Sequence, residues 1–144
     1  MHFVTGGAFN GKSNWVKDFY QLEDTPHLWI SAYRGAELPA GTVEWEKKDV
    51  VVLEGIELWL NILAGTALDV RGQWQTFLQA WKSWERGAEG RMLILIGSDI
   101  TKGIVPIDAE ERKWRDAAGW AFQDTAAAAD QVDLVWYGIR QKLK

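Results

Sequence analysis

Apolar residues along the chain follow two alternating patterns: short continuous runs, and longer segments with helical spacing. The continuous runs are residues 2–5, 28–32, 50–53, 92–96 and 132–136. Short apolar runs bounded by glycine or polar residues are typical of strands buried within a sheet. The run at 50–53 contains only Val and Leu, which favours a central parallel strand covered on both faces. Gly138 then turns the chain, and residues 139–144 are expected to add an edge strand.

Helical spacing separates these strand candidates. Residues 13–22 and 55–68 each place apolar side chains on one face, and a third helical stripe precedes the run at 92–96. That stripe consists of Trp74, Phe77, Leu78, Trp81 and Trp84. Pro106 is expected to open a long helix to about residue 129, because proline and acidic residues are favourable in a first turn. Residues 34–41 carry glycine and proline and are expected to form a loop.

The alternation of strands and helices predicts an α/β sandwich around a mostly parallel central sheet. At 144 residues, the chain is expected to form one nucleotide-binding domain spanning residues 1–144. Nucleotide binding is inferred from residues 6–13, the loop that follows the first predicted strand.

This loop matches the phosphate-loop pattern at every defined position. Its residues are Gly6, Gly7, Ala8, Phe9, Asn10, Gly11, Lys12 and Ser13. Glycines let the backbone curl so that N–H groups point at phosphate oxygens, and the following helix directs its positive end at the same anion. Lys12 is expected to reach the terminal phosphates as a catalytic residue, and the Ser13 hydroxyl is expected to hold Mg²⁺. The sequence therefore predicts a P-loop NTPase that binds a nucleoside triphosphate.

A magnesium–triphosphate site also needs a carboxylate at the end of a neighbouring strand. Glu54 directly follows the run at 50–53, so it should lie at the carboxyl edge, where α/β sheets bind ligands. It is expected to bind Mg²⁺ through water or to act as a base toward an acceptor hydroxyl. The alternative is a solvated acid at the end of a strand.

Further polar residues are weaker candidates. Ser98 and Asp99 follow the run at 92–96, and Asp99 is either a second site carboxylate or a cap for the loop. Arg112, Lys113 and Arg115 lie near the start of the long helix, where they either clamp phosphate or form an exposed charged face.

Composition limits the partners. A net charge of −4 argues against nucleic acid or an anionic membrane as a partner. The absence of cysteine excludes disulfides and thiolate chemistry. The first glycine comes too early for a signal-peptide core, and no apolar run approaches the roughly 20 residues of a membrane helix, so a cytoplasmic location is expected. Ten tryptophans without a repeat indicate core and interface packing.

Four blocks of sequence resemble the bifunctional adenosylcobinamide kinase/adenosylcobinamide-phosphate guanylyltransferase family of cobalamin biosynthesis. The blocks are residues 4–13 with the phosphate loop, Leu53-Glu54 with Leu58-Trp59-Leu60, Gly103-Ile104-Val105-Pro106, and a C-terminal part beginning at Arg115-Asp116-Ala117-Ala118-Gly119. The last block also includes Gln123, residues 126–130, Val132 and Gly138-Ile139, and it is the most specific of the four.

The resemblance implies a RecA-like three-layer sandwich and phosphorylation of a hydroxyl on the aminopropanol arm of adenosylcobinamide. It implies ATP or GTP as substrate with Mg²⁺, and a homo-oligomer with active sites near subunit interfaces. It also implies a second activity, GMP transfer from GTP through a histidine nucleophile.

The chain departs from the family where that histidine belongs, on a helical segment after the second strand. Only residues 33–42 separate Ser31-Ala32 from Val43-Glu44-Trp45, and this segment contains no histidine. His2 and His27 come before that position, so guanylyl transfer is expected to be lost, the alternative being that His27 has been recruited as the nucleophile.

Other departures from the family pattern fall at positions expected to serve the kinase activity. The family's arginine and serine in the loop are Phe9 and Asn10 here, and its asparagine–glutamate pair after the third strand is Ser98-Asp99. A family glycine is Thr101, and two polar positions in the long helix are Trp120 and Phe122. The function expected first is a cobinamide-type kinase that lacks guanylyl transfer. The alternatives are a non-catalytic or regulatory nucleotide-binding descendant, and an NTPase that only hydrolyses.

Overall fold

The computed structural model describes residues 1–39 and 49–144, and in these ranges six strands alternate with four α-helices and a 3₁₀ turn. In chain order the elements are β1 (His2–Gly6), α1 (Lys12–Phe19), β2 (His27–Ser31), η1 (Ala32–Arg34), β3 (Val50–Glu54), α2 (Ile56–Thr66), α3 (Val70–Arg86), β4 (Met92–Ser98), α4 (Ala109–Ala128), β5 (Gln131–Trp136) and β6 (Ile139–Lys142).

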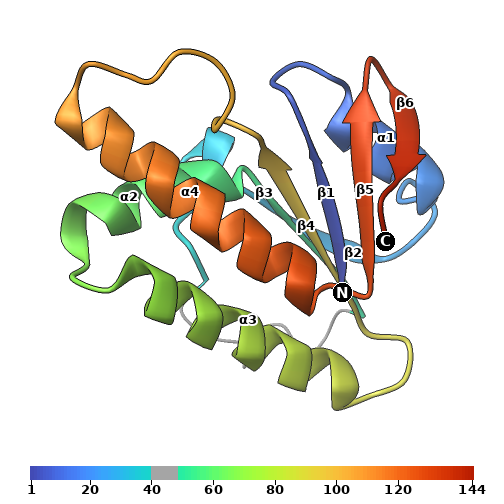
Figure 1. Cartoon of the computed structure of the whole chain (residues 1–144). Helices are drawn as coiled ribbons and strands as arrows, with labels where there is room; N and C mark the ends of the chain where they lie inside the picture. The colour runs from blue at the N-terminus through green and yellow to red at the C-terminus, as the bar shows by residue number, and fades with distance from the viewer. Residues whose placement is uncertain (40–48) are drawn as a thin grey trace.

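The strands form one sheet in the order β2-β3-β4-β1-β5-β6 (Figure 1). Strands β1 to β5 all pair in parallel, and β6 pairs antiparallel with β5 at the edge. Parallel pairing brings the carboxyl ends of β1, β3 and β4 to one edge, with Gly6 opposite Ser98 and Glu54 opposite Ile96. The predicted α/β class with a mostly parallel central sheet is confirmed.

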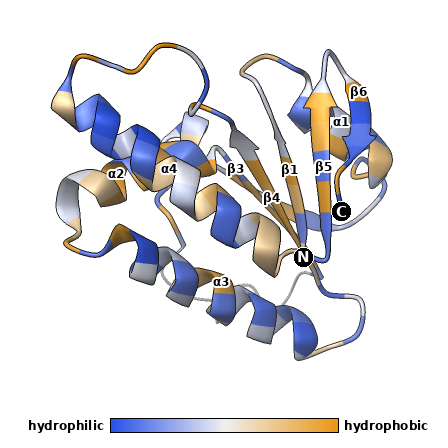
Figure 2. Ribbon diagram, in the orientation of Figure 1, coloured by the Kyte–Doolittle hydropathy of each residue, from blue (hydrophilic) through white to orange (hydrophobic). Residues whose placement is uncertain are grey.

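Helices cover both faces of this sheet, which gives the predicted three layers. Helices α2, α3 and α4 lie over one face, and α1 lies over the other, beside β1 and β5 (Figure 1). Apolar residues concentrate on the strands, while the outward faces of α3 and α4 are largely hydrophilic (Figure 2). The predicted tryptophan stripe lies on the buried side of α3, where Trp74, Trp81 and Trp84 pack into the larger core with Trp59 of α2. Val16 of α1 packs against strand residues in a smaller second core.

The long helix starts later than predicted. The helix begins at Ala109 rather than at Pro106, because the Asp108 carboxylate accepts hydrogen bonds from the backbone N–H groups of Glu110 and Glu111 at 2.9 and 3.0 Å. Aspartate at this position satisfies N–H groups that have no partner within the helix. Pro106 therefore lies in the loop between β4 and α4.

Smaller boundary differences occur elsewhere. Helix α1 ends at Phe19 rather than near residue 22, because Gln21 adopts a left-handed backbone with φ of 50° while the next residue, Leu22, is buried in the second core. Strand β2 ends at Ser31, and Ala32 already belongs to the 3₁₀ turn. Of the loop expected at 34–41, residues 40 and 41 lie outside the described residues, as does the Val43-Glu44-Trp45 stretch.

Within residues 1–39 and 49–144, no helix combines the length and apolar character needed to span a bilayer.

Candidate functional site

The phosphate loop is shaped by two backbone positions that require glycine. Gly6 ends β1 with φ of 146°, and a Cβ there would lie 2.2 Å from the Val135 carbonyl oxygen of β5. Gly11 has φ of 81° directly before α1, and as a glycine at the N-cap position it offers no side chain to cap the helix. The first N–H groups of α1 therefore face the loop, which is the arrangement that binds anions at helix N-termini.

Neighbouring strands hold the loop in place. The N–H of Gly138, in the β5–β6 turn, donates to the Asn10 carbonyl at 2.8 Å, and the N–H of Asp99 donates to the Gly6 carbonyl at 2.9 Å. Phe9 lies at the tip with a left-handed φ of 58° and a fully exposed side chain.

Lys12 is buried, with its ammonium group directed back into the loop. Its Nζ donates to the Gly7 carbonyl at 2.7 Å and to Ser98 Oγ, at the end of β4, at 3.0 Å. Burial lowers the pKa of the ammonium, and the carboxylates of Glu57 and Glu54 partly oppose this effect. A partly desolvated cation held at a phosphate loop interacts strongly with a phosphate oxygen.

Ser13 and Glu54, predicted from separate patterns, lie in direct contact. The Ser13 hydroxyl donates to Glu54 Oε1, and Trp29 Nε1 donates to Glu54 Oε2 at 3.0 Å. Burial alone would raise the pKa of Glu54, but hydrogen bonding, first of all from the Ser13 hydroxyl, and the nearby charge of Arg34 outweigh it and hold this pKa below its ordinary value. Glu54 is therefore ionised at neutral pH beside a hydroxyl oxygen.

This pair fits Mg²⁺, which prefers oxygen ligands and keeps several waters. Across the described ranges no cluster of three or more His, Cys, Asp or Glu side chains is arranged to hold a metal. A magnesium ion at Ser13 and Glu54 would thus complete its shell with phosphate oxygens and water, as is usual when it binds with a nucleotide.

Asp99 caps the start of the β4–α4 loop and does not face the phosphate loop. Its Oδ1 accepts hydrogen bonds from the backbone N–H of Thr101 at 2.9 Å and from the Thr101 hydroxyl at 2.6 Å. Of the two alternatives for Asp99, the geometry supports the cap, while the adjacent Ser98 belongs to the site.

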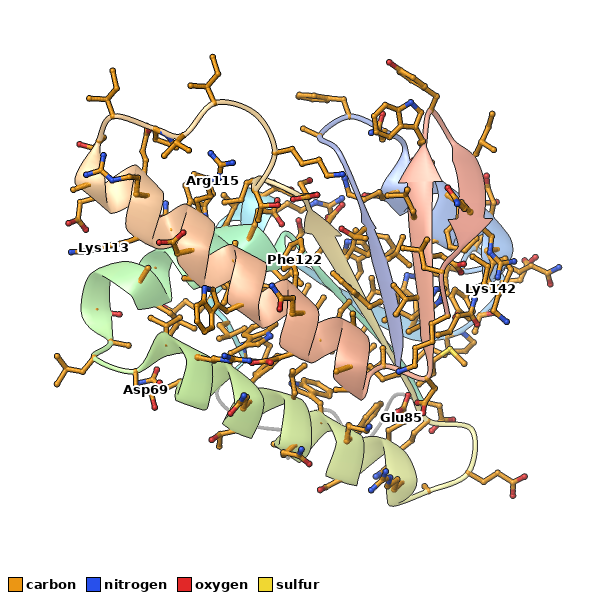
Figure 3. The ribbon with its side chains drawn as sticks, in the orientation of Figure 1. Asp69, Glu85, Lys113, Arg115, Phe122 and Lys142 are labelled. Atoms are coloured by element: carbon orange, nitrogen blue, oxygen red, sulfur yellow. The ribbon has the colours of Figure 1, made fainter. Side chains whose placement is uncertain are left out.

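The two arginines near the start of α4, Arg112 and Arg115, hold the β4–α4 loop instead of reaching the phosphate loop. Arg115 donates to the backbone carbonyls of Thr101, Gly103 and Ile104, and it lies beneath this loop in Figure 3. Arg112 donates to the carbonyls of Pro106 and Ile107. Lys113 pairs with Glu110 at 2.7 Å on the outer side of the helix (Figure 3). None of the three residues forms the phosphate clamp: Lys113 lies on an exposed charged face, and the two arginines in addition stabilise the backbone of the loop.

A pocket of about 550 Å³ adjoins the phosphate loop. Apart from loop residues and the start of α1, its walls are Tyr33, Glu57, Leu58, Ile96, Ser98, Ile100 and Trp114. Tyr33, Glu57 and Trp114 were not among the sequence candidates. Tyr33 follows the end of β2 and Glu57 lies in the first turn after β3, so the rule that selected Glu54 would have found both if extended a few residues past each strand.

Comparison with known proteins identifies the family, and the matched range begins after the phosphate loop. A family model described as "Cobinamide kinase / cobinamide phosphate guanyltransferase" matches residues 23–143. The chain is 44% identical over 52 residues to the "Bifunctional adenosylcobalamin biosynthesis protein CobU" of Salmonella typhimurium, and 42% identical over 52 residues to the protein of the same name from Escherichia coli. Each alignment covers 36% of this chain and only 29% of the relative. Because the family model spans most of the chain, the chain belongs to the cobinamide kinase / cobinamide phosphate guanyltransferase family.

Proposed function

We propose that the chain is an NTP-dependent kinase that phosphorylates a hydroxyl of a cobinamide-like acceptor in cobalamin biosynthesis, and that it has lost guanylyl transfer. The observation that carries this proposal is the convergence of Lys12, Ser13 and Glu54 beside a pocket large enough for part of an acceptor. A protein that only bound nucleotide need not retain both the lysine and the serine–carboxylate pair, so their joint presence favours the kinase over the non-catalytic alternative.

Each residue has a distinct role in this proposal. The backbone N–H groups of residues 7–12 bind the phosphates of ATP or GTP, and Lys12 moves from the Gly7 carbonyl to the terminal phosphate, where it stabilises the transferring group. Ser13 and Glu54 hold Mg²⁺, which neutralises phosphate charge when bound. Phosphoryl transfer depends mainly on positioning and electrostatics, so this small set suffices.

The pocket supports a partly apolar acceptor such as adenosylcobinamide. Leu58, Ile96, Ile100 and Trp114 form apolar walls, and its few polar groups lie near the phosphate loop. Ile104, Val105 and Ile107 of the β4–α4 loop are also exposed. This apolar surface supports both a large corrinoid acceptor and a homo-oligomer that brings a second copy to the loop.

The positions of both histidines support the loss of guanylyl transfer. His2 begins β1 and His27 begins β2, so each lies at the amino edge of a parallel sheet, about 13 Å of strand away from the carboxyl edge. His2 is also buried and hydrogen-bonded to Tyr20. Residues 40–48, outside the described ranges, contain no histidine. After incubation with GTP, mass spectrometry should detect no acid-labile GMP adduct, and an adduct on His27 would contradict the proposed loss.

Nucleotide turnover with and without acceptor tests the kinase proposal. Incubation with Mg-ATP or Mg-GTP should release nucleoside diphosphate only when adenosylcobinamide is present. Release that does not depend on the acceptor would instead support an NTPase. Binding without turnover would support the non-catalytic descendant and refute both enzymatic proposals.

A further inference from the structure

A buried carboxylate that the phosphate-loop pattern does not use lies inside the pocket. Glu57, in the first turn of α2, is only 3% exposed. Its Oε2 accepts the backbone N–H of Ser98 at 2.9 Å, and its Oε1 accepts the hydroxyl of Tyr33. Burial of a carboxylate is unfavourable, and a backbone N–H needs only a neutral acceptor. The Ser98 N–H alone therefore does not account for a carboxylate at this position; its charge also offsets that of buried Lys12, and neither contact explains why its second oxygen accepts from Tyr33.

Glu57 is connected to the phosphate loop by a continuous polar path. The Tyr33 hydroxyl oxygen lies 3.2 Å from Ser98 Oγ, which in turn accepts a hydrogen bond from Lys12 Nζ at 3.0 Å. These four residues all line the pocket of about 550 Å³, on the side nearest the loop. An acceptor hydroxyl placed beside the terminal phosphate would therefore meet Tyr33 and Ser98 first, with Glu57 behind them.

Glu54 is less suited to receive a proton from the acceptor. Its oxygens accept from the Ser13 hydroxyl and from Trp29 Nε1, and it is the carboxylate proposed above to hold Mg²⁺ together with Ser13. It is also absent from the walls of the pocket. The two carboxylates thus occupy different environments, which is how enzymes assign separate tasks to similar groups.

We infer that Tyr33 and Glu57 form a proton relay that activates an alcohol acceptor, with Tyr33 touching the substrate hydroxyl and Glu57 receiving the proton. This inference rests on the kinase function proposed above. In the step, the acceptor oxygen forms a bond to the γ-phosphorus while the bond from that phosphorus to the β–γ bridging oxygen breaks. The acceptor proton passes to the Tyr33 oxygen as the Tyr33 proton passes to Glu57, and the nucleoside diphosphate leaves as an anion.

The protonation of Tyr33 is consistent with this relay. Burial and the hydrogen bond to Glu57 raise the pKa of the Tyr33 phenol well above its ordinary value. The phenol therefore stays protonated at neutral pH, donates to Glu57, and keeps an oxygen lone pair free to accept from the substrate.

Kinetics of Tyr33→Phe, Glu57→Gln and the double variant test the relay, with adenosylcobinamide as the acceptor. Glu89→Gln is the matched control, because Glu89 is an exposed acid in the α3–β4 turn, at the other edge of the sheet. Each single variant should lower kcat by about 10²-fold, the usual contribution of a positioned proton acceptor. The KM values should change little, and the double variant should be no slower than the slower single variant, because both residues serve one step.

Nucleotide affinity and thermal unfolding of each variant separate chemistry from folding. Glu57→Gln keeps an oxygen for the Ser98 N–H, and if it nevertheless fails to fold, Tyr33→Phe, which removes a single hydroxyl from a side chain that is 54% exposed, decides the question. Unchanged kcat in the folded variants, with an active wild type, would overturn the relay and leave the kinase proposal standing. A wild type that binds nucleotide but transfers no phosphate to the acceptor would overturn both.

Discussion

His2 should make the stability of the fold depend on pH in a window where few other groups titrate. Its ring is 2% exposed, with Nε2 2.9 Å from Asp133 Oδ2 of β5 and Nδ1 2.7 Å from the Tyr20 hydroxyl. A carboxylate can only accept, so Nε2 carries the proton and Nδ1 accepts from Tyr20. Burial raises the pKa of Tyr20 to about 12, so this phenol remains a donor. The neutral imidazole therefore hydrogen-bonds Tyr20 through Nδ1 and directs its Nε2 proton toward Asp133.

The size of the effect follows from the pKa of His2. Burial lowers this pKa from 6.5 to about 4, although Asp133 opposes the shift. Between these values the unfolded chain binds a proton that the folded chain does not, so the free energy of unfolding rises with pH. Lowering the pH from 7 to 5 should remove about 2 kcal/mol of stability, and the full loss near pH 4 should approach roughly 3 kcal/mol.

Carboxyl groups contribute to the pH dependence of stability only at lower pH. Burial raises the pKa of Asp133, but hydrogen bonds from Arg140 and Gln131 outweigh it and leave this pKa below its ordinary value. The stability that a depressed carboxyl pKa supplies is lost only as the pH falls through the range below about 4. Measurements between pH 7 and pH 5 therefore isolate His2.

Urea unfolding at pH 7 and pH 5 measures this dependence in the wild type, His2→Gln and the matched control His27→Gln. His27 lies on β2, and its Nδ1 is 2.8 Å from the Thr25 carbonyl oxygen, so it has no part in the buried network. The wild type and the control should lose about 2 kcal/mol on acidification, and His2→Gln should lose much less. Equal losses in all three proteins, or an NMR titration of His2 near 6.5, would refute the reasoning.

Three substitutions test the site and its frame. Lys12→Ala should lower phosphoryl transfer by about 10²–10³-fold in a steady-state assay, the cost of removing one preorganised transition-state donor. Glu54→Gln should raise the Mg²⁺ concentration needed for half-maximal turnover, and an unchanged magnesium titration would argue against a metal role. Gly6→Ala should destabilise the fold by at least about 3 kcal/mol in urea unfolding, because its Cβ would lie 2.2 Å from the Val135 carbonyl oxygen at a φ that disfavours side chains.

The parts of the site that sequence reasoning identified are those set by strand ends. Glu54 and Ser13 could be paired in advance because parallel strands place their carboxyl ends on one edge, and the structure joins them by a hydrogen bond. The strand order, with β4 between β3 and β1, depends on pairing between distant segments and had no local signal.

Residues that depend on loop geometry were less predictable. The sequence left two roles open for Asp99, a second site carboxylate or a loop cap, and its contact with Thr101 in the structure identifies the cap. Arg115 lies in the second turn of α4, and only the path of the β4–α4 loop places backbone carbonyls within its reach. Tyr33 and Glu57 meet because η1 brings the end of β2 over the start of α2, a long-range contact that no spacing encodes.

Transfer of labelled phosphate tests the central claim most directly. The wild type is incubated with Mg²⁺, adenosylcobinamide and ATP or GTP that carries ³²P in the γ-position, and the corrinoid is then separated from nucleotide and inorganic phosphate. The label should appear in the corrinoid, and Lys12→Ala should abolish most of this transfer. Label found only in inorganic phosphate, or retained in the bound nucleotide, would contradict the assignment of this site to a kinase.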